Sequence, residues 1–390
     1  MFWGLLLSTS GSSMIWPFLL IYVSNKLTLP LTAIASLTTI NAAMELLASI
    51  VAGPITDRLG RKWVMVFSLL ADAVIFLFMI RADTYAGFAI LMAMRGVSNP
   101  LYRVGADAML ADMIPPEKRL DAYALIRMAQ NAGIAIGPAV GGMLASTSYS
   151  LAFLAATIGM GSYGLLLAFF ARETLKKRAH EDVMAAARER LGGYDRLLKD
   201  RPFLATIGSM AFGWITAVLM WIILPVYVNR NFNVPESQYG WIPTTNALMV
   251  VFLQVLITRM TRRHEPRRMM CLGMSLYAIA NGLVALMTGF WGFWICMVIM
   301  SLGELIIVPT SSTYTANTAP ADMRGRYMSI YGLIWTFGRA FGPLLGGWLN
   351  DNINPQAIWY GGLLIGLLSA AALFILSRKE HQAPHTPVGT

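Results

Sequence analysis

Ionisable side chains inside long apolar segments are the residues of this chain most able to do chemistry. They are Glu45, Asp72, Arg95, Arg103, Asp107, Arg127, Glu304 and Arg339. Each is costly in hydrocarbon and therefore needs a partner or a water-filled cavity. Loss of solvent penalises the charged form of a carboxyl group, so an acid at such a position can bind and release a proton. These residues indicate proton transfer within a membrane.

The segments that position these residues are apolar enough to be membrane helices. Hydrophobic residues make up 56% of the chain and charged residues only 13%, which is low for a water-soluble protein. About twelve segments of roughly twenty residues can each cross a hydrocarbon core. They lie near 3–23, 31–55, 63–81, 84–112, 121–145, 149–171, 202–228, 237–258, 269–288, 290–318, 326–349 and 355–378.

We therefore predict an all-α integral membrane protein with two six-helix bundles, at 1–171 and 202–378. A cytoplasmic linker at 172–201, with a short surface helix at EDVMAAARERL, joins them, and 379–390 form a disordered tail.

The two bundles are copies of one unit. The run NAGIAIGPAVGG ends at Gly142, and FGRAFGPLLGG ends at Gly347, a separation of 347 − 142 = 205 residues. The same separation pairs Asn41 with Asn246 and Trp16 with Trp221. Many secondary transporters are duplicated in this way, with the ligand path between the halves.

The formal net charge of +10 is explained by topology. The Lys and Arg residues of the loops gather on one side of the predicted bundle, and only Lys26, Arg81 and Arg230 lie on the other. This asymmetry predicts a cytoplasmic location for the basic side and for both termini. It indicates contact with anionic lipid and no nucleic-acid partner. The first segment begins at Phe2 without a charged leader, so we predict a retained helix and not a signal peptide.

A loop after the second segment, GPITDRLGRK, resembles a signature of the major facilitator superfamily. The glycine-rich run in the fifth segment is similar to the signature of its antiporter branch, the twelve-helix drug:proton antiporters. The resemblance covers the whole chain and implies gating roles for Gly53, Asp57, Arg58, Gly60, Arg61, Lys62, Gly133, Gly137, Pro138 and Gly141.

The loop also has a physical interpretation of its own. An acid, a tight glycine turn and three bases can dock on the other bundle in one state and leave it in another. Alternatively, the bases serve only topology. The second copy carries Arg262 where the first carries Asp57, so only the first loop is predicted to act as a latch.

Gly133, Gly137 and Gly141 recur every four residues and form a smooth stripe, which Gly338, Gly342 and Gly346 repeat in the eleventh segment. Such a stripe lets a neighbouring backbone approach closely. Pro138 permits a bend in the same turn. The stripe can serve packing alone, but the resemblance implies a gating contact with the partner bundle.

Glu304 is the first candidate for proton coupling. It lies mid-helix in SLGELIIVPT, which resembles the Gly-Glu of the tenth helix in some members of the antiporter branch, and it aligns with Asn99, since 304 − 205 = 99. We expect both side chains to point into the shared cavity. The alternative is a structural pairing of Glu304 with a base such as Arg339.

Glu45 is the second candidate, because it lies twelve residues before Asp57, roughly 18 Å deeper along a helix. Asp72 is the weakest of the three, since it is more plausibly paired within its own bundle. Arg95, Asn99, Arg103 and Asp107 recur every four residues, so they form one polar helix face. Bases on such a face and Arg127 can keep the acids charged.

Residues at duplicated positions give the predicted cavity an aromatic and polar lining. They are Trp16, Tyr22, Asn41, Trp221, Tyr227 and Asn246. With nearby methionines they suit amphipathic or cationic compounds. The alternative is that these residues only pack the helices or lie at the lipid interface.

The function that we predict is a proton-coupled efflux antiporter that works by alternating access. Alternatives are a carrier of a lipid or a sugar on the same fold, with or without ion coupling, or, from another class, an intramembrane enzyme or receptor. The histidines fall in loops and the tail, and no metal-ligand spacing or catalytic motif occurs. We expect no enzyme activity and no cofactor, a proton gradient as the energy source, and a monomer in the bacterial cytoplasmic membrane.

Overall fold

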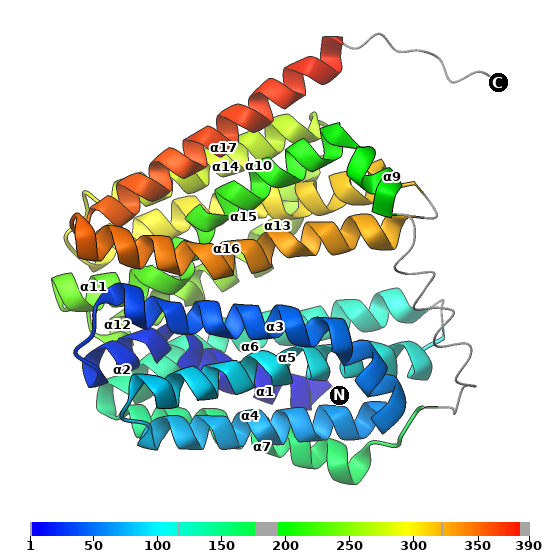
Figure 1. The fold of residues 1–390 in the computed structure, drawn as a ribbon, viewed down its shortest axis with the longest axis vertical. Helices are drawn as coiled ribbons and strands as arrows, with labels where there is room; N and C mark the ends of the chain where they lie inside the picture. Colours follow the sequence, from blue (N-terminus) through cyan, green and yellow to red (C-terminus); the bar gives the residue numbers. More distant parts are fainter. Residues whose placement is uncertain (1, 116–117, 176–193, 321–322, 383–390) are drawn as a thin grey trace.

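The computed structural model describes residues 2–115, 118–175, 194–320 and 323–382 (Figure 1). The first half contains α1 (Phe2–Ile15), η1 (Trp16–Phe18), α2 (Leu19–Lys26), α3 (Leu31–Leu59), α4 (Arg61–Arg81), α5 (Tyr85–Met113), α6 (Arg119–Thr147) and α7 (Tyr149–Phe170). The second half contains α9 (Tyr194–Lys199), α10 (Arg201–Val218), η3 (Leu219–Ile223), α11 (Leu224–Phe232), α12 (Glu236–Tyr239), α13 (Trp241–Thr261), α14 (Pro266–Val284), α15 (Phe290–Thr318), α16 (Arg324–Asn352) and α17 (Ala357–Gln382).

These helices confirm the predicted all-α class and agree with twelve spans. Within the described residues, eight helical stretches are long and apolar enough to cross a membrane. The long helices α5, α6, α14 and α16 fall outside this set. Three of them, α5, α6 and α16, carry most of the predicted intramembrane charges, and charged side chains lower the hydropathy of a helix.

The first membrane-spanning helical stretch of each half, α1 to α2 and α10 to α11, is interrupted at an equivalent place. A 3-10 turn, η1, separates α1 from α2 at Pro17, and a π-helix, η3, precedes Pro225 in α11. Proline lacks the N–H that a regular helix requires, which explains a local change of helix type. The duplicated residues Trp16 and Trp221 both lie in these interruptions.

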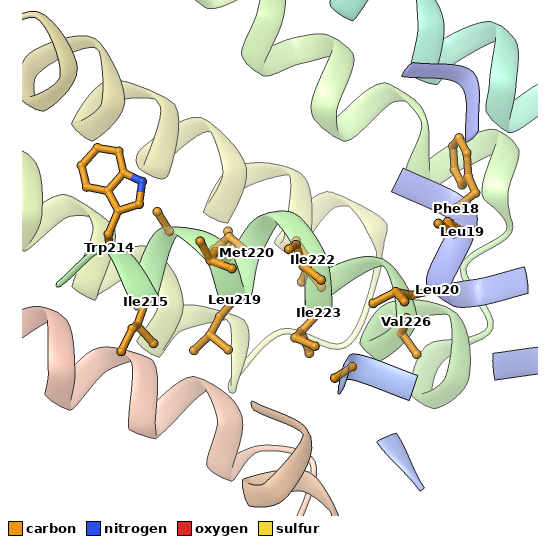
Figure 2. Close-up of a cluster of buried hydrophobic side chains, with 14 of the residues drawn as sticks. Phe18, Leu19, Leu20, Trp214, Ile215, Leu219, Met220, Ile222, Ile223 and Val226 are labelled. Carbon is orange, nitrogen blue, oxygen red and sulfur yellow. The ribbon is translucent and has the colours of Figure 1, made fainter. Parts of the chain in front are cut away.

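The two halves meet chiefly at one end of the molecule. We call the end that carries Arg58, Arg61 and Lys62 the basic end, and the end that carries α11 and α12 the opposite end. Across the halves, α2 contacts α11, α3 contacts α16, and α6 contacts α12 and α13. The ribbons of α3 and α16 lie close together at the opposite end and separate toward the basic end (Figure 1). At the opposite end, Leu20 of α2 lies beside Val226 of α11 (Figure 2).

The predicted linker helix cannot be compared with the structure, whereas the predicted start of the tail can. The helix predicted within the linker lies outside the described residues. The tail was predicted to begin at 379, but α17 extends to Gln382. The sequence explains the difference, because Pro384 is the first residue after 357 that is incompatible with a helix interior, and proline disfavours helical backbone at the residue before it.

Candidate functional site

An ion pair joins the two halves near the middle of α3 and α16. Arg339 Nη2 lies 2.8 Å from Glu45 Oε2, and the two side chains are 27% and 13% exposed. A second guanidinium, that of Arg103 in α5, lies 3.7 Å from Glu45 Oε1 and is 58% exposed. The exposed contact is long and solvent-screened, so it contributes little. Arg339 is therefore the principal partner of Glu45.

Asn41, one helical turn before Glu45, completes the contact with Arg339. Its Oδ1 accepts a hydrogen bond of 3.1 Å from Arg339 Nη2. Its Nδ2 donates to the carbonyl of Met92 in α5 at 3.0 Å. Asn41 is buried, and α5 approaches closely because a Cβ at Gly96 would meet the Asn41 carbonyl. The orientation of the amide is thus fixed from within the first half.

The indole of Trp16 lies near guanidinium groups from both halves. Arg95 Cζ is 4.7 Å from the ring centroid, and Arg339 Cζ is 6.0 Å from it. Arg95 also lies over Phe76, at 5.2 Å. Cations over aromatic faces gain electrostatic energy, most strongly when they are desolvated, and Arg95 is only 7% exposed. The site therefore combines one carboxylate, one amide and one indole from the first half with an arginine from the second.

Asp72 is held within its own half, in agreement with the interpretation that it pairs within its own bundle. Ser98 of α5 donates a short hydrogen bond to Asp72 Oδ1. The carboxyl group is buried, and Arg95 is its charged neighbour. Asp72 and Arg95 are thus charged neighbours within the first half, and Arg95 also interacts electrostatically with Arg339 and Glu45 of the ion pair.

Glu304 has its hydrogen-bond partner in the second half. Asn246 Nδ2 donates to Glu304 Oε2 and to Ser301 Oγ, both at 2.9 Å. The alternative that Arg339 pairs with Glu304 is wrong, because Arg339 is bound to Glu45. The duplicated asparagines therefore differ: Asn41 serves the contact between the halves, whereas Asn246 holds an acid inside one half.

Two equivalent hydrogen bonds connect the halves between the ion pair and the opposite end. Thr39 Oγ1 donates to the carbonyl of Ala340 at 2.8 Å, and Thr244 Oγ1 donates to the carbonyl of Ala135 at 3.0 Å. Both partners follow the duplication, since 244 − 39 = 205 and 340 − 135 = 205. Each carbonyl precedes a proline by three residues, and neighbouring Thr side chains commonly satisfy backbone groups near such prolines. We call these two bonds the threonine pair.

Further polar contacts close the opposite end. Asp351 of α16 accepts hydrogen bonds from the backbone N–H groups of Leu31 and Thr32 at the start of α3, at 3.1 and 2.8 Å. Tyr149 donates to Glu236 at 2.6 Å. These contacts join α3 to α16 and α7 to α12 across the two halves.

The glycine stripes lie in a different place from the one that the resemblance implied. A Cβ at Gly133, Gly137 or Gly141 would meet Thr9, Ser13 or Met14 of α1, in the same half. The stripe of α16 packs in the same way against α10 and η3. Contact with the partner half is made by the adjoining face, on which Pro138 lies against Gly240. The stripes therefore bring helices together within each half.

The loop at the basic end makes its described polar contacts within the first half. Arg61 forms an ion pair with Asp112 at the end of α5, and Glu173 accepts hydrogen bonds from the first backbone N–H groups of α4 at 3.0 and 3.1 Å. Gly60 has φ of +94°, which a glycine adopts without strain. Asp57 and Arg58 are exposed. The latch stays a prediction, since it concerns another conformation.

Comparison with known proteins agrees with this architecture. The family model of the Major Facilitator Superfamily matches residues 1–228 and 214–389. This chain belongs to the Major Facilitator Superfamily. It is therefore a transporter, and each half of the duplication is matched separately.

Relatives of the transporter include an Na(+), Li(+), K(+)/H(+) antiporter of Planococcus maritimus, 26% identical over 89% of this chain and 86% of the relative. The multidrug resistance protein MdtH of Yersinia pestis (strain Pestoides F) is 24% identical over 83% and 80%. Among solved structures, the nucleoside transporter NupG has a TM-score of 0.79 at 13% identity, over 96% of this chain and 98% of that one. A bacterial homolog of the human lysosomal transporter Spinster, in an inward-facing conformation, has a TM-score of 0.75 at 15% identity, over 97% and 95%.

Two aromatic residues expected in the transporter's cavity lie elsewhere. The Tyr22 hydroxyl donates to the carbonyls of Met79 and Ile80, and its ring lies 5.0 Å from that of Phe153 in the same half. Tyr227 is 2% exposed, and its ring is 5.0 Å from that of Trp359. Both residues pack within their own halves, each in an aromatic cluster near the opposite end.

The remaining predicted residues have the following surroundings. Trp221 is half-buried against the hydrophobic core of the second half. Asn99 and Asp107 are exposed on the same face of α5 as Arg103, and Arg127 is exposed on α6. Gly53 and Lys62 lie at the basic end, half-buried. Among the described residues, no group of three or more His, Cys, Asp or Glu side chains is placed to hold a metal ion.

The sequence interpretation missed the residues that join the halves by hydrogen bonds. Thr39 and Thr244 precede the duplicated asparagines by two residues, and the same 205-residue alignment would have paired them. Asp351 and Glu236 have no such signal, because their roles depend on which helix ends meet across the molecule.

Proposed function

We propose that this transporter is a proton-coupled efflux antiporter for small amphipathic compounds, in a bacterial cytoplasmic membrane with the basic end in the cytoplasm. The observation that carries the proposal is the ion pair between Glu45 and Arg339. It is a contact between the halves that depends on the charge of one carboxylate. The partners of the transporter in this proposal are protons, a small-molecule substrate and membrane lipid.

The ion pair links protonation to movement of the halves. When Glu45 is charged, its attraction to Arg339 favours the conformation in which α3 and α16 meet at mid-membrane. A proton on Glu45 removes this attraction, which is strong where solvent is scarce. The equilibrium between conformations then shifts by the energy difference of that one contact, typically about 1–3 kcal/mol for a coupling of this kind.

The relatives support both parts of the proposal, antiport and drug export. One of them is named as a cation/H(+) antiporter and another as a multidrug resistance protein. The basic end holds the start of α1, the end of α17 and the turn between α3 and α4 (Figure 1), and basic segments stay on the cytoplasmic side of bacterial membranes. Halves that touch at the opposite end and separate toward the basic end fit a conformation open to the cytoplasm.

Transport in proteoliposomes under an imposed pH gradient tests the proposal. We expect gradient-driven transport from the wild type. Glu45→Gln, which cannot exchange a proton, should lose this gradient-driven transport, and any transport that remains should be independent of the pH gradient.

Glu304→Gln is the matched comparison, because it removes the other mid-membrane carboxyl group from the second half. If only Glu304→Gln abolished coupling, Glu304 would be the proton carrier, as the sequence first suggested. Gradient-driven transport by both single variants and by the double variant would refute proton coupling through either acid.

A further inference from the structure

Arg339 is bound by a set of groups that recognises an organic cation. Glu45 supplies a carboxylate at 2.8 Å, Asn41 supplies an amide oxygen at 3.1 Å, and Trp16 supplies an indole face at 6.0 Å. Carboxylates and aromatic faces are the usual partners of guanidinium and other organic cations. Two side chains with oxygen donors are too few for a hard metal ion such as Ca²⁺, which takes six or more oxygens.

The three recognising groups belong to the first half, whereas the cation that they bind belongs to the second. Asn41 is fixed by its bond to the Met92 carbonyl in α5. Trp16 is fixed in η1 and covered by Arg95. When α16 moves during alternating access, Arg339 moves with it and the three groups remain together. The first half then presents a preformed site for a cation.

The charges around this site also favour a cation once Arg339 has left. Arg95 interacts more strongly with Asp72 than with Glu45. Arg103 contacts Glu45 only at 3.7 Å and is 58% exposed, so water screens it. Without Arg339, Glu45 therefore keeps only the solvated contact with Arg103 and the longer-range attraction of Arg95.

We propose that Arg339 occupies the cargo site of this transporter in the present conformation, and that the cargo is an organic cation whose charge is spread over a planar group. The cargo binds Glu45, Asn41 and Trp16 in place of the guanidinium. Arg339 is thus a tethered competitor, which releases cargo when the halves meet. This inference rests on the proposed transport function and names its substrate class.

Binding of ethidium, a planar fluorescent cation, to the purified full-length protein tests the proposal without any gradient. A competitor that fills a site nine-tenths of the time weakens the apparent affinity about ten-fold. We therefore expect Arg339→Ala to lower the Kd of ethidium by about ten-fold, measured by fluorescence anisotropy at fixed pH and salt. Glu45→Gln should weaken binding, and the double variant should not regain the tight binding of Arg339→Ala.

Two further variants separate competition from other effects. Arg103→Ala removes the other arginine beside Glu45 and should give a much smaller gain, since that group is already solvated. Thr39→Val breaks a different bond between the halves and shifts the balance of conformations while Arg339 stays in the protein, so Arg339→Ala should lower the Kd further in that background. No further gain from Arg339→Ala in the Thr39→Val background would mean that affinity reports only the balance of conformations, and the competitor role would be wrong.

The remaining outcomes are also decisive. Unchanged or weaker ethidium binding by Arg339→Ala, in protein whose thermal unfolding matches the wild type, would overturn the proposal. Arg339→Gln provides the same test if the alanine variant does not fold. Because binding is measured without a gradient, tight binding by Arg339→Ala together with no pH-driven transport by the wild type would refute proton coupling and leave the cation site standing.

Discussion

The threonine pair provides the sharpest prediction, because the duplication supplies two equivalent perturbations. Thr39→Val and Thr244→Val keep the side-chain shape and remove the hydroxyl that crosses between the halves. Both bonds, at 2.8 and 3.0 Å, have good length, and Thr244 is only 4% exposed. Each substitution should therefore favour conformations in which the halves separate at the opposite end.

The expected magnitude follows from hydrogen bonds between membrane helices. Such a bond is worth about 0.6 kcal/mol on average and about 1.7 kcal/mol at most. Each variant should shift the equilibrium between conformations roughly three- to eighteen-fold. The two bonds share no partner, so the double variant should add the two effects and reach at least roughly eight-fold.

Spin-label distances across the opposite end measure this shift. Ala86 at the start of α5 and Gln356 before α17 are exposed positions in different halves, usable once Cys271 and Cys296 are replaced. We expect a growing population of longer distances in each variant. Thr38→Val is the matched control, because Thr38 donates to Ala35 within its own helix at 2.7 Å.

A distance distribution that changes equally in Thr38→Val and Thr39→Val would refute the reasoning, as would unchanged distances in the double variant. Unchanged distances would mean that apolar contacts hold the opposite end closed without help from the hydroxyls, and equal changes would mean that the shift does not come from the bond between the halves.

Two further substitutions test other parts of the molecule. Asp57→Asn should shift the population toward the cytoplasm-open state, because it removes the acid of the predicted latch. Removal of the charge at Arg262 should have a much smaller effect. If cysteine accessibility across the basic end responded equally to both substitutions, the loop would have a topological role only. Gly141→Val should destabilise the protein by about 1–3 kcal/mol, because its Cβ would overlap the Met14 backbone, whereas Gly208→Ala, which meets nothing within 4 Å, should leave the thermal unfolding temperature nearly unchanged.

The sequence predicted the helices and their duplication because both are local or repetitive features. Apolar length determines which segments can cross a membrane, and the 205-residue offset of the glycine-proline runs identifies the copies. The same reasoning placed Asp72 within its own half and the face of Arg95 and Arg103 on one side of α5. It could not assign the glycine stripes to the correct neighbour, because a smooth helix face looks the same whichever helix packs on it.

Which charge meets which was decided only by the tertiary structure. Glu45 and Arg339 are 339 − 45 = 294 residues apart, and nothing in either helix encodes the partner on the other. Glu304 and Glu45 are both mid-helix acids by sequence, yet one is bonded to Asn246 in its own half and the other to an arginine across the interface. The difference arises from the way each helix is rotated about its axis, which determines the face that meets the other half. It also depends on the hydrogen bonds of the threonine pair and Asp351, which fix how the halves meet at the opposite end. Side-chain type determines what chemistry a residue can do, and the packing of the two halves against each other determines the partner with which it does it.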